Sequence, residues 1–175
     1  MTTATFRVPK GKQEPASERA NALAERLEKG AQALLEFAES LTPQEWETRL
    51  PHDGRKVGVV VHHVASAYPV EIQFGETIAS GKALRGVTPE VIDQMNAEHA
   101  KAYDGATKEM ALDLLRRNSA AAASVLRSFS DAELDRAALA SLYSDAPVTT
   151  QFILEDHAVR HSYHHLARIR RAVNR

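Results

Sequence analysis

The sequence contains no cysteine, which excludes disulfide bonds, thiolate metal ligands and a cysteine nucleophile. Any bound metal would be held by imidazole or carboxylate groups, and any thiol chemistry would need a thiol from outside the chain. An excess of one charge is also lacking, because 22 Lys and Arg residues against 23 Asp and Glu residues give a net charge of −1. This balance predicts neither a nucleic acid nor an anionic membrane as a partner.

Long hydrophobic runs are absent as well. No segment approaches the ~20 apolar residues of a transmembrane helix, and the N-terminal stretch MTTATFRVPKGKQEP lacks the apolar core of a signal peptide. We therefore expect a cytoplasmic protein with no membrane partner. The polar residues 1–14 are expected to form a flexible N-terminal arm, and residues 15–175 suit a single domain with a sizeable core.

Apolar residues recur at three- and four-residue spacings along most of the chain, which predicts helices. The segment 57–61 is rich in valine and compatible with a strand, but no partner strand is evident, so we predict a helix bent at Pro69. Residues 137–147 are interpreted as a connector that covers a pocket. The expected helices are 15–41, 57–80, 88–103, 107–129 and 148–173, with short helical turns opening at Thr42 and Ser130. Four or five long helices with essentially no strand indicate an all-α helix bundle.

Four of the eight histidines fall in one stretch of the last predicted helix, DHAVRHSYHHLARIRR at 156–171. His161 and His165 are four residues apart and border the apolar stripe, and this spacing lets two imidazoles reach one ion. A metal site, a proton relay and a histidine-rich polar surface remain alternatives at this point. The predicted core stripe of this helix consists of Phe152, Val159, Tyr163, Leu166, Ile169 and Val173.

A third imidazole would have to come from another helix, and the pair His62-His63 offers one. By helical periodicity His63 lies closer to the valine stripe of 57–80, where a histidine is costly to bury without a partner. His63 is therefore the candidate for the third ligand. His62 is expected either to contact a metal ligand without binding the metal or to lie at the surface. The remaining histidines are interpreted as surface or helix-edge residues: His52, His99 and His157.

Two motifs resemble those of a known family. The stretch DGRKVGVVVHHVA at 53–65 resembles the second-helix motif of the DinB-like, or YfiT-like, superfamily, and HSYHHLARI at 161–169 resembles its last-helix motif. Residues 91–96 are similar to the opening of its third helix, and the resemblance covers roughly residues 20–173. It implies an up-down-down-up four-helix bundle with short extra helices. It also implies a divalent metal, usually zinc or nickel, bound by His63, His161 and His165.

The resemblance further implies that His164 lies beside the metal, where it would orient a ligand or transfer a proton. Known activities in the superfamily include mycothiol-dependent maleylpyruvate isomerase and bacillithiol or mycothiol S-transferases. We therefore expect a homodimeric thiol S-transferase that acts on a small-molecule substrate with a low-molecular-weight thiol such as bacillithiol or mycothiol. The alternatives are a metal-dependent hydrolase with the same ligands and a non-enzymatic binding or stress-response module. Glu71 or Asp156 could be recruited as a fourth ligand, and Asp156, Glu155 or a backbone carbonyl could orient a metal-binding histidine.

Overall fold

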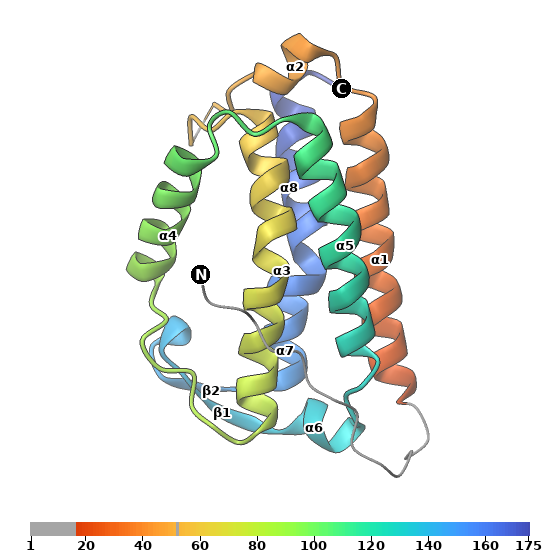
Figure 1. Ribbon diagram of the computed structural model, residues 1–175. Helices are drawn as coiled ribbons and strands as arrows, with labels where there is room; N and C mark the ends of the chain where they lie inside the picture. Colours follow the sequence, from red (N-terminus) through yellow and green to blue (C-terminus); the bar gives the residue numbers. More distant parts are fainter. Residues whose placement is uncertain (1–16, 52) are drawn as a thin grey trace.

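The computed structural model describes residues 17–51 and 53–175, so the predicted arm at 1–14 and His52 lie outside the described residues. Four long helical segments form a bundle. They are α1 (Glu18–Glu39), α3 (Val57–Ala79), α5 (Lys108–Leu126) and a last segment made of α7 (Thr150–Leu154), the π-helical η2 (Glu155–Val159) and α8 (Arg160–Ala172). In Figure 1, α1 and the last segment run upward while α3 and α5 run downward, which confirms the predicted up-down-down-up order. No helix within the described ranges is long and apolar enough to cross a membrane.

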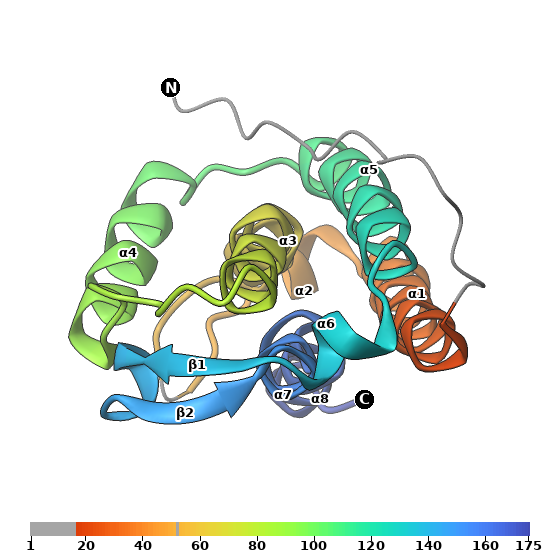
Figure 2. The ribbon, with the colours of Figure 1, turned by 90° about the horizontal axis from the view of Figure 1, so that it is seen from below.

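Because α3 and α5 are parallel, the chain has to travel back along the whole bundle between them. The helix α4 (Pro89–Ala102) lies in this connection and stands beside α3, apart from the other bundle helices (Figures 1 and 2). None of its residues is buried. The bundle core lies instead between the other helices and includes the large buried side chains Leu27, Leu34, Tyr68, Leu115 and Ile153.

Helix starts follow local capping chemistry. The Ser17, Thr88 and Thr107 side chains accept a hydrogen bond from the backbone N–H three residues later, at the starts of α1, α4 and α5. The short helices α2 (Pro43–Glu47) and α6 (Asp131–Asp135) open after Thr42 and Ser130, where the sequence predicted helical turns, and each begins with a capping box.

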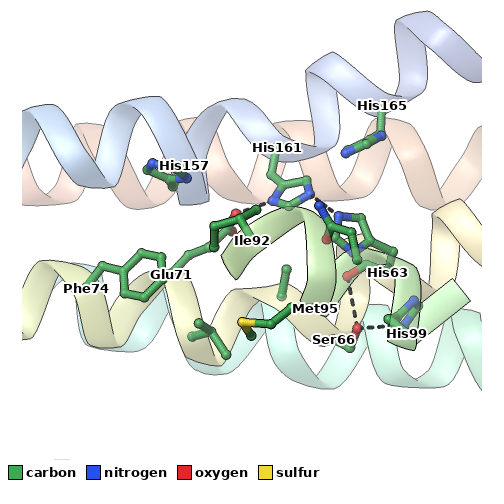
Figure 3. Close-up of a pocket in the computed structure, with 13 residues that line it drawn as sticks. His63, Ser66, Glu71, Phe74, Ile92, Met95, His99, His157, His161 and His165 are labelled. Atoms are coloured by element: carbon green, nitrogen blue, oxygen red, sulfur yellow. Dashed lines mark hydrogen bonds and ion pairs between the residues drawn. The ribbon is translucent and has the colours of Figure 1, made fainter. Parts of the chain in front are cut away.

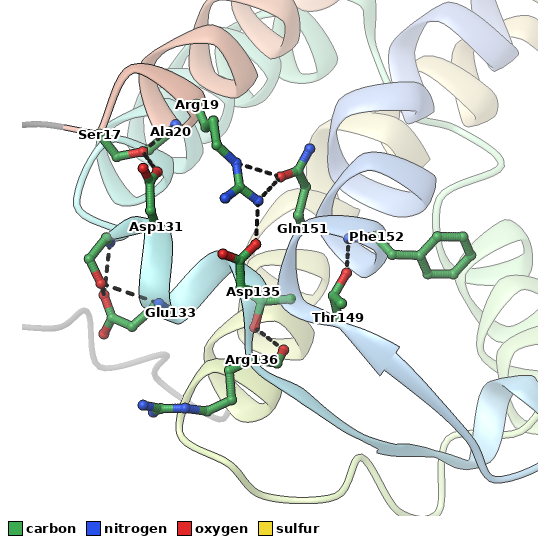
Figure 4. A network of polar contacts seen from close by, with 12 residues as sticks. Ser17, Arg19, Ala20, Asp131, Glu133, Asp135, Arg136, Thr149, Gln151 and Phe152 are labelled. Atoms are coloured by element: carbon green, nitrogen blue, oxygen red, sulfur yellow. Dashed lines mark hydrogen bonds and ion pairs between the residues drawn. The ribbon is translucent and has the colours of Figure 1, made fainter.

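A polar network closes one end of the bundle, where the first turn of α1 meets α6 and α7 (Figure 4). The guanidinium of Arg19 contacts Asp135 at 2.7 Å and donates through Nε to Gln151 at 3.1 Å. The Ser17 hydroxyl donates to Asp131. These contacts place the start of the last segment against the start of α1, although the two segments are more than a hundred residues apart.

The segment predicted as a strandless connector contains a small hairpin, so the expectation of essentially no strand was wrong here. The strands β1 (Ala137–Ala140) and β2 (Ala146–Thr149) pair antiparallel around the 3₁₀ turn η1 (Ser141–Tyr143). The amide of Leu84 donates to the carbonyl of Leu139 at 2.8 Å and ties the hairpin to the loop after α3. Both strands have only four residues; β1 is mostly alanine and β2 contains Pro147, so neither shows the run of β-branched residues that predicts a strand.

The last segment is not a continuous α-helix, because residues 155–159 form a π-helical turn. A π turn contains more residues per turn than an α turn, so it shifts the face presented by everything downstream. Two predicted core residues, Phe152 and Tyr163, are 44% and 43% exposed, whereas His165 is only 6% exposed. The predicted core face was wrong at these two positions, which lie together at one edge of the predicted stripe, whereas Val159, Leu166 and Ile169 are buried as predicted.

Candidate metal centre

Three histidines from two neighbouring helices meet on one side of the bundle. His63 comes from the second turn of α3, and His161 and His165 come from α8; one nitrogen of each lies within 4.8 Å of those of the other two. The Nε2 atoms of His161 and His63 are 3.2 Å apart. Two nitrogens that each lie about 2.0–2.1 Å from a tetrahedral ion are roughly 3.3–3.4 Å apart. The observed spacing therefore fits two imidazoles that share one ion.

A buried carboxylate fixes the orientation of His161. Glu71 lies two turns after His63 on α3, is 5% exposed, and contacts Nδ1 of His161 through Oε1 (Figure 3). An ionised carboxylate only accepts hydrogen bonds, so Nδ1 of His161 carries the proton and Nε2 presents its lone pair toward His63. Metal-binding histidines are commonly held in this way by a carboxylate behind them.

Sequence reasoning considered Glu71 only as a fourth ligand and assigned the orienting role to Asp156, Glu155 or a backbone carbonyl. The structure shows Glu71 in contact with His161. The signal that could have found it is a glutamate on the otherwise apolar buried face of α3, in helical register with His63.

Burial keeps His63 and His165 in the neutral form that binds metal. Burial, reinforced by the nearby His161, lowers the pKa of His63 to about 2, and burial also lowers the pKa of His165. Nδ1 of His165 is buried and has no hydrogen-bond partner among the described residues. A buried polar atom without a partner costs free energy. The donor set, its protonation and this unpartnered nitrogen all fit a divalent ion.

The three histidines lie in the wall of a cavity of about 370 Å³ between α3, α4 and the last segment. Ile92 and Met95 of α4 line the cavity together with His161 and Glu71 (Figure 3). The rest of the apolar lining comes from α3 and consists of Ala67, Val70 and Phe74. Within the described residues the histidine cluster includes no fourth candidate ligand. An ion bound there would have coordination positions open to the cavity.

The structure corrects the surface expectation for His99. Its ring lines the cavity, and its Nε2 lies 2.9 Å from Nδ1 of His62 and 3.2 Å from the Ser66 hydroxyl. Burial lowers the pKa of His99 to about 4. His62 is 5% exposed and stacks on Tyr103 with ring centroids 4.0 Å apart. The sequence could not place these residues, because α4 has no buried face that would indicate what it covers.

The other histidines of the last segment differ in their surroundings. His157, expected at the surface or helix edge, lines the cavity, and its Nε2 lies 3.1 Å from the Tyr143 hydroxyl. His164 is exposed, and its ring contacts that of His165 edge-on with centroids 5.1 Å apart. It also lines a smaller cavity of about 130 Å³ together with Glu71 and the two α8 ligand candidates. His164 therefore lies next to the cluster without belonging to it.

The sequence matches the family model of the DinB superfamily over residues 26–169, and the chain belongs to that superfamily. It matches no curated protein. Among solved structures it is similar to YfiT from Bacillus subtilis, a probable metal-dependent hydrolase with an unusual four-helix bundle topology. That match has a TM-score of 0.70 and 21% identity, and it covers 95% of this chain and 93% of YfiT.

Two further solved structures share the fold. The colibactin self-resistance protein ClbS, solved in complex with double-stranded DNA, matches with a TM-score of 0.68 and 16% identity over 92% of this chain and 98% of that one. A putative DinB family member from Exiguobacterium sibiricum 255-15 matches with a TM-score of 0.56 and 19% identity over 91% and 92% of the two chains.

Proposed function

We propose that the protein is a metal-dependent enzyme that binds zinc or nickel through His63, His161 and His165 and acts as a thiol S-transferase. The observation that carries this proposal is the convergence of three imidazoles in the wall of a cavity of about 370 Å³. Structural zinc sites are usually closed by four protein ligands, whereas catalytic sites use three and leave a position for water or substrate.

When bound, a divalent ion held by neutral imidazoles lowers the pKa of a thiol or water molecule that reaches it. In this proposal Glu71 orients His161, and the apolar cavity wall excludes bulk water. His164 serves as the catalytic residue that transfers a proton beside the site. The thiol is a low-molecular-weight compound such as bacillithiol or mycothiol, and a chain without cysteine offers no competing thiol of its own. The electrophile is a small molecule, and the protein is a homodimer.

A metal-dependent hydrolase with the same ligands is the second candidate. The similarity to YfiT, a probable metal-dependent hydrolase, supports it. The two candidates differ in their need for a thiol. Consumption of an electrophile such as monobromobimane only in the presence of added cysteine or bacillithiol supports the transferase, whereas hydrolysis of p-nitrophenyl acetate without thiol supports the hydrolase.

Elemental analysis of the purified protein tests the metal site itself. We expect stoichiometric zinc or nickel in the natural protein and none in the His161→Ala variant. The matched control is His164→Ala, which should keep the metal but lose turnover, because His164 lies outside the cluster. Absence of metal from the natural protein, even after dialysis against zinc and nickel, contradicts the proposal.

A further inference from the structure

The cavity contains a second polar group, His157, away from His63. His157 packs edge-on against Phe74 with ring centroids 5.9 Å apart. Phe74 follows His63 by eleven residues on α3, which corresponds to roughly 16 Å along the helix axis. In Figure 3, His157 and Phe74 lie together on one side, and His63 and His99 lie on the other. The cavity therefore extends along α3 from His63 to Phe74, and His157 lies at the Phe74 end, one helical turn before His161.

The hydrogen bonds around Tyr143 determine which nitrogen of His157 carries its proton. The Tyr143 hydroxyl contacts both Oδ2 of Asp156 and Nε2 of His157. Asp156 pairs with Arg160 at 3.0 Å, and an ionised carboxylate only accepts. Tyr143 therefore donates its one proton to Asp156, and its oxygen accepts from Nε2–H of His157. Burial, reinforced by the hydrogen bond to Asp156, raises the pKa of Tyr143, so the phenol keeps this proton.

The same hydrogen bonds leave the lone pair of His157 on Nδ1. Burial lowers the pKa of His157, which keeps the ring neutral. Among the described residues, no group forms a hydrogen bond with Nδ1. The hydrogen bond with Tyr143 at one edge and the edge-on contact with Phe74 position the ring in the cavity wall.

We propose that Nδ1 of His157 recognises the substrate by accepting a hydrogen bond from a donor at the end of the molecule remote from the metal. This inference rests on the proposed metal site. It defines the substrate class as a metal-binding head, such as a thiol, joined through an apolar middle to a hydroxyl, amide or ammonium group. The apolar middle lies along Val70, Ile92 and Met95. A carboxylate at the remote end is rejected, because a neutral ring whose N–H is already engaged offers it only a lone pair.

Thiol binding to the cobalt-substituted protein tests the inference without an enzymatic assay, because a cobalt–thiolate bond gives a visible absorption band. The probes are ω-mercaptoalkanols of increasing chain length, each compared with its methyl ether and with the corresponding mercaptocarboxylic acid. At the length that spans the cavity, we expect the alcohol to bind about 10-fold more tightly than the ether, as one neutral hydrogen bond would give. In His157→Phe the preference disappears, while the affinity for the ether is retained.

The ¹⁵N NMR signals of the imidazole in the metal-free protein test the tautomer separately. We expect His157 to be protonated at Nε2 in the natural protein and to lose this preference in Tyr143→Phe. The matched control is Tyr163→Phe, which removes an exposed tyrosine hydroxyl that donates to the carbonyl of Arg26. A proton on Nδ1 of His157 overturns the inference whether or not metal binds.

The two proposals fail in different ways. If cobalt does not bind, the metal site is wrong and the inference falls with it. If cobalt and thiols bind but the alcohol and the ether bind equally, only the role of His157 is wrong. A preference for the alcohol that persists in His157→Phe also overturns the role of His157 and leaves the metal site intact.

Discussion

Glu71 is a buried carboxylate whose only described partner is a histidine. Its Oε1 contacts His161, while its Oε2 is buried without a hydrogen-bond partner among the described residues. Such an arrangement is costly in a protein core unless the carboxylate serves another group. At the scale of single residues, the burial of the Glu71 carboxyl group behind His161 is therefore explained by the positive ion proposed in front of His161.

The Glu71→Gln variant tests this explanation. We expect its metal affinity to fall about 10-fold or more, because the amide supports His161 less strongly than the carboxylate does. Competition with a chromophoric chelator measures the affinity. The control is Glu25→Gln, which removes an exposed carboxylate on α1 and should leave the affinity unchanged. Equal affinities for the two variants contradict the role of Glu71.

The buried histidines also predict how the stability of the metal-free protein depends on pH. Burial lowers the pKa of His99 to about 4 and that of His63 to about 2, from an ordinary value of 6.5. At a pH between the lowered pKa of each histidine and 6.5, the unfolded chain binds more protons than the folded protein. The free energy of unfolding therefore decreases as pH falls through this range. We expect this decrease to begin below about pH 6.5 and to continue to about pH 4 for His99 and lower for His63.

Urea unfolding at a series of pH values measures this dependence. In His99→Gln the decrease above about pH 4 should be smaller, because one group with a lowered pKa has been removed. A stability that is constant from neutral pH to pH 4 contradicts the burial of neutral histidines.

At the scale of elements, close packing of α3 against α7 positions the last segment. The Leu154 side chain occupies the space where a side chain at Gly75 would lie. The Gly75→Ala variant should therefore lower the free energy of unfolding by about 1–3 kcal/mol through overpacking. Thermal or urea unfolding measures the change. Gly105→Ala is the control, because no other atom lies within 4 Å of its added methyl group. Similar stabilities for the two variants contradict this account of the interface.

The sequence predicted the elements well and their mutual contacts less well. The bundle helices and the pair His161–His165 follow from apolar periodicity and spacing, which are local properties. The positions of His99 and Tyr143 depend on where α4 and the hairpin pack, and neither element has a buried stripe long enough to reveal it. The π turn itself could not be predicted, because a helical wheel assumes a constant period.

At the scale of the whole molecule, charge balance leads us to expect no nucleic-acid partner, although ClbS shares the fold and was solved with double-stranded DNA. Two of the C-terminal arginines are already paired, Arg168 with Asp53 at 2.9 Å and Arg175 with Glu45 at 3.4 Å. Binding that depends on phosphate contacts needs several free cations on one surface.

We therefore predict no measurable binding of double-stranded DNA at physiological salt, and fluorescence anisotropy with a labelled duplex measures it. A titration at low salt serves as the control for weak, purely electrostatic attraction. Tight binding that persists at physiological salt contradicts the prediction.

The connection between α3 and α5 has a consequence for how this protein can change over evolution. Because these two helices are parallel, a long connection has to run back along the bundle between them. The helix α4 in this connection forms one wall of the cavity but contributes no buried residue to the core. Substitutions at Ile92, Met95 and Asn96 can therefore reshape the cavity at little cost to folding, because the core and the histidine cluster belong to other helices. One wall of the cavity can thus vary largely independently of the helices that form the core and carry the three histidines.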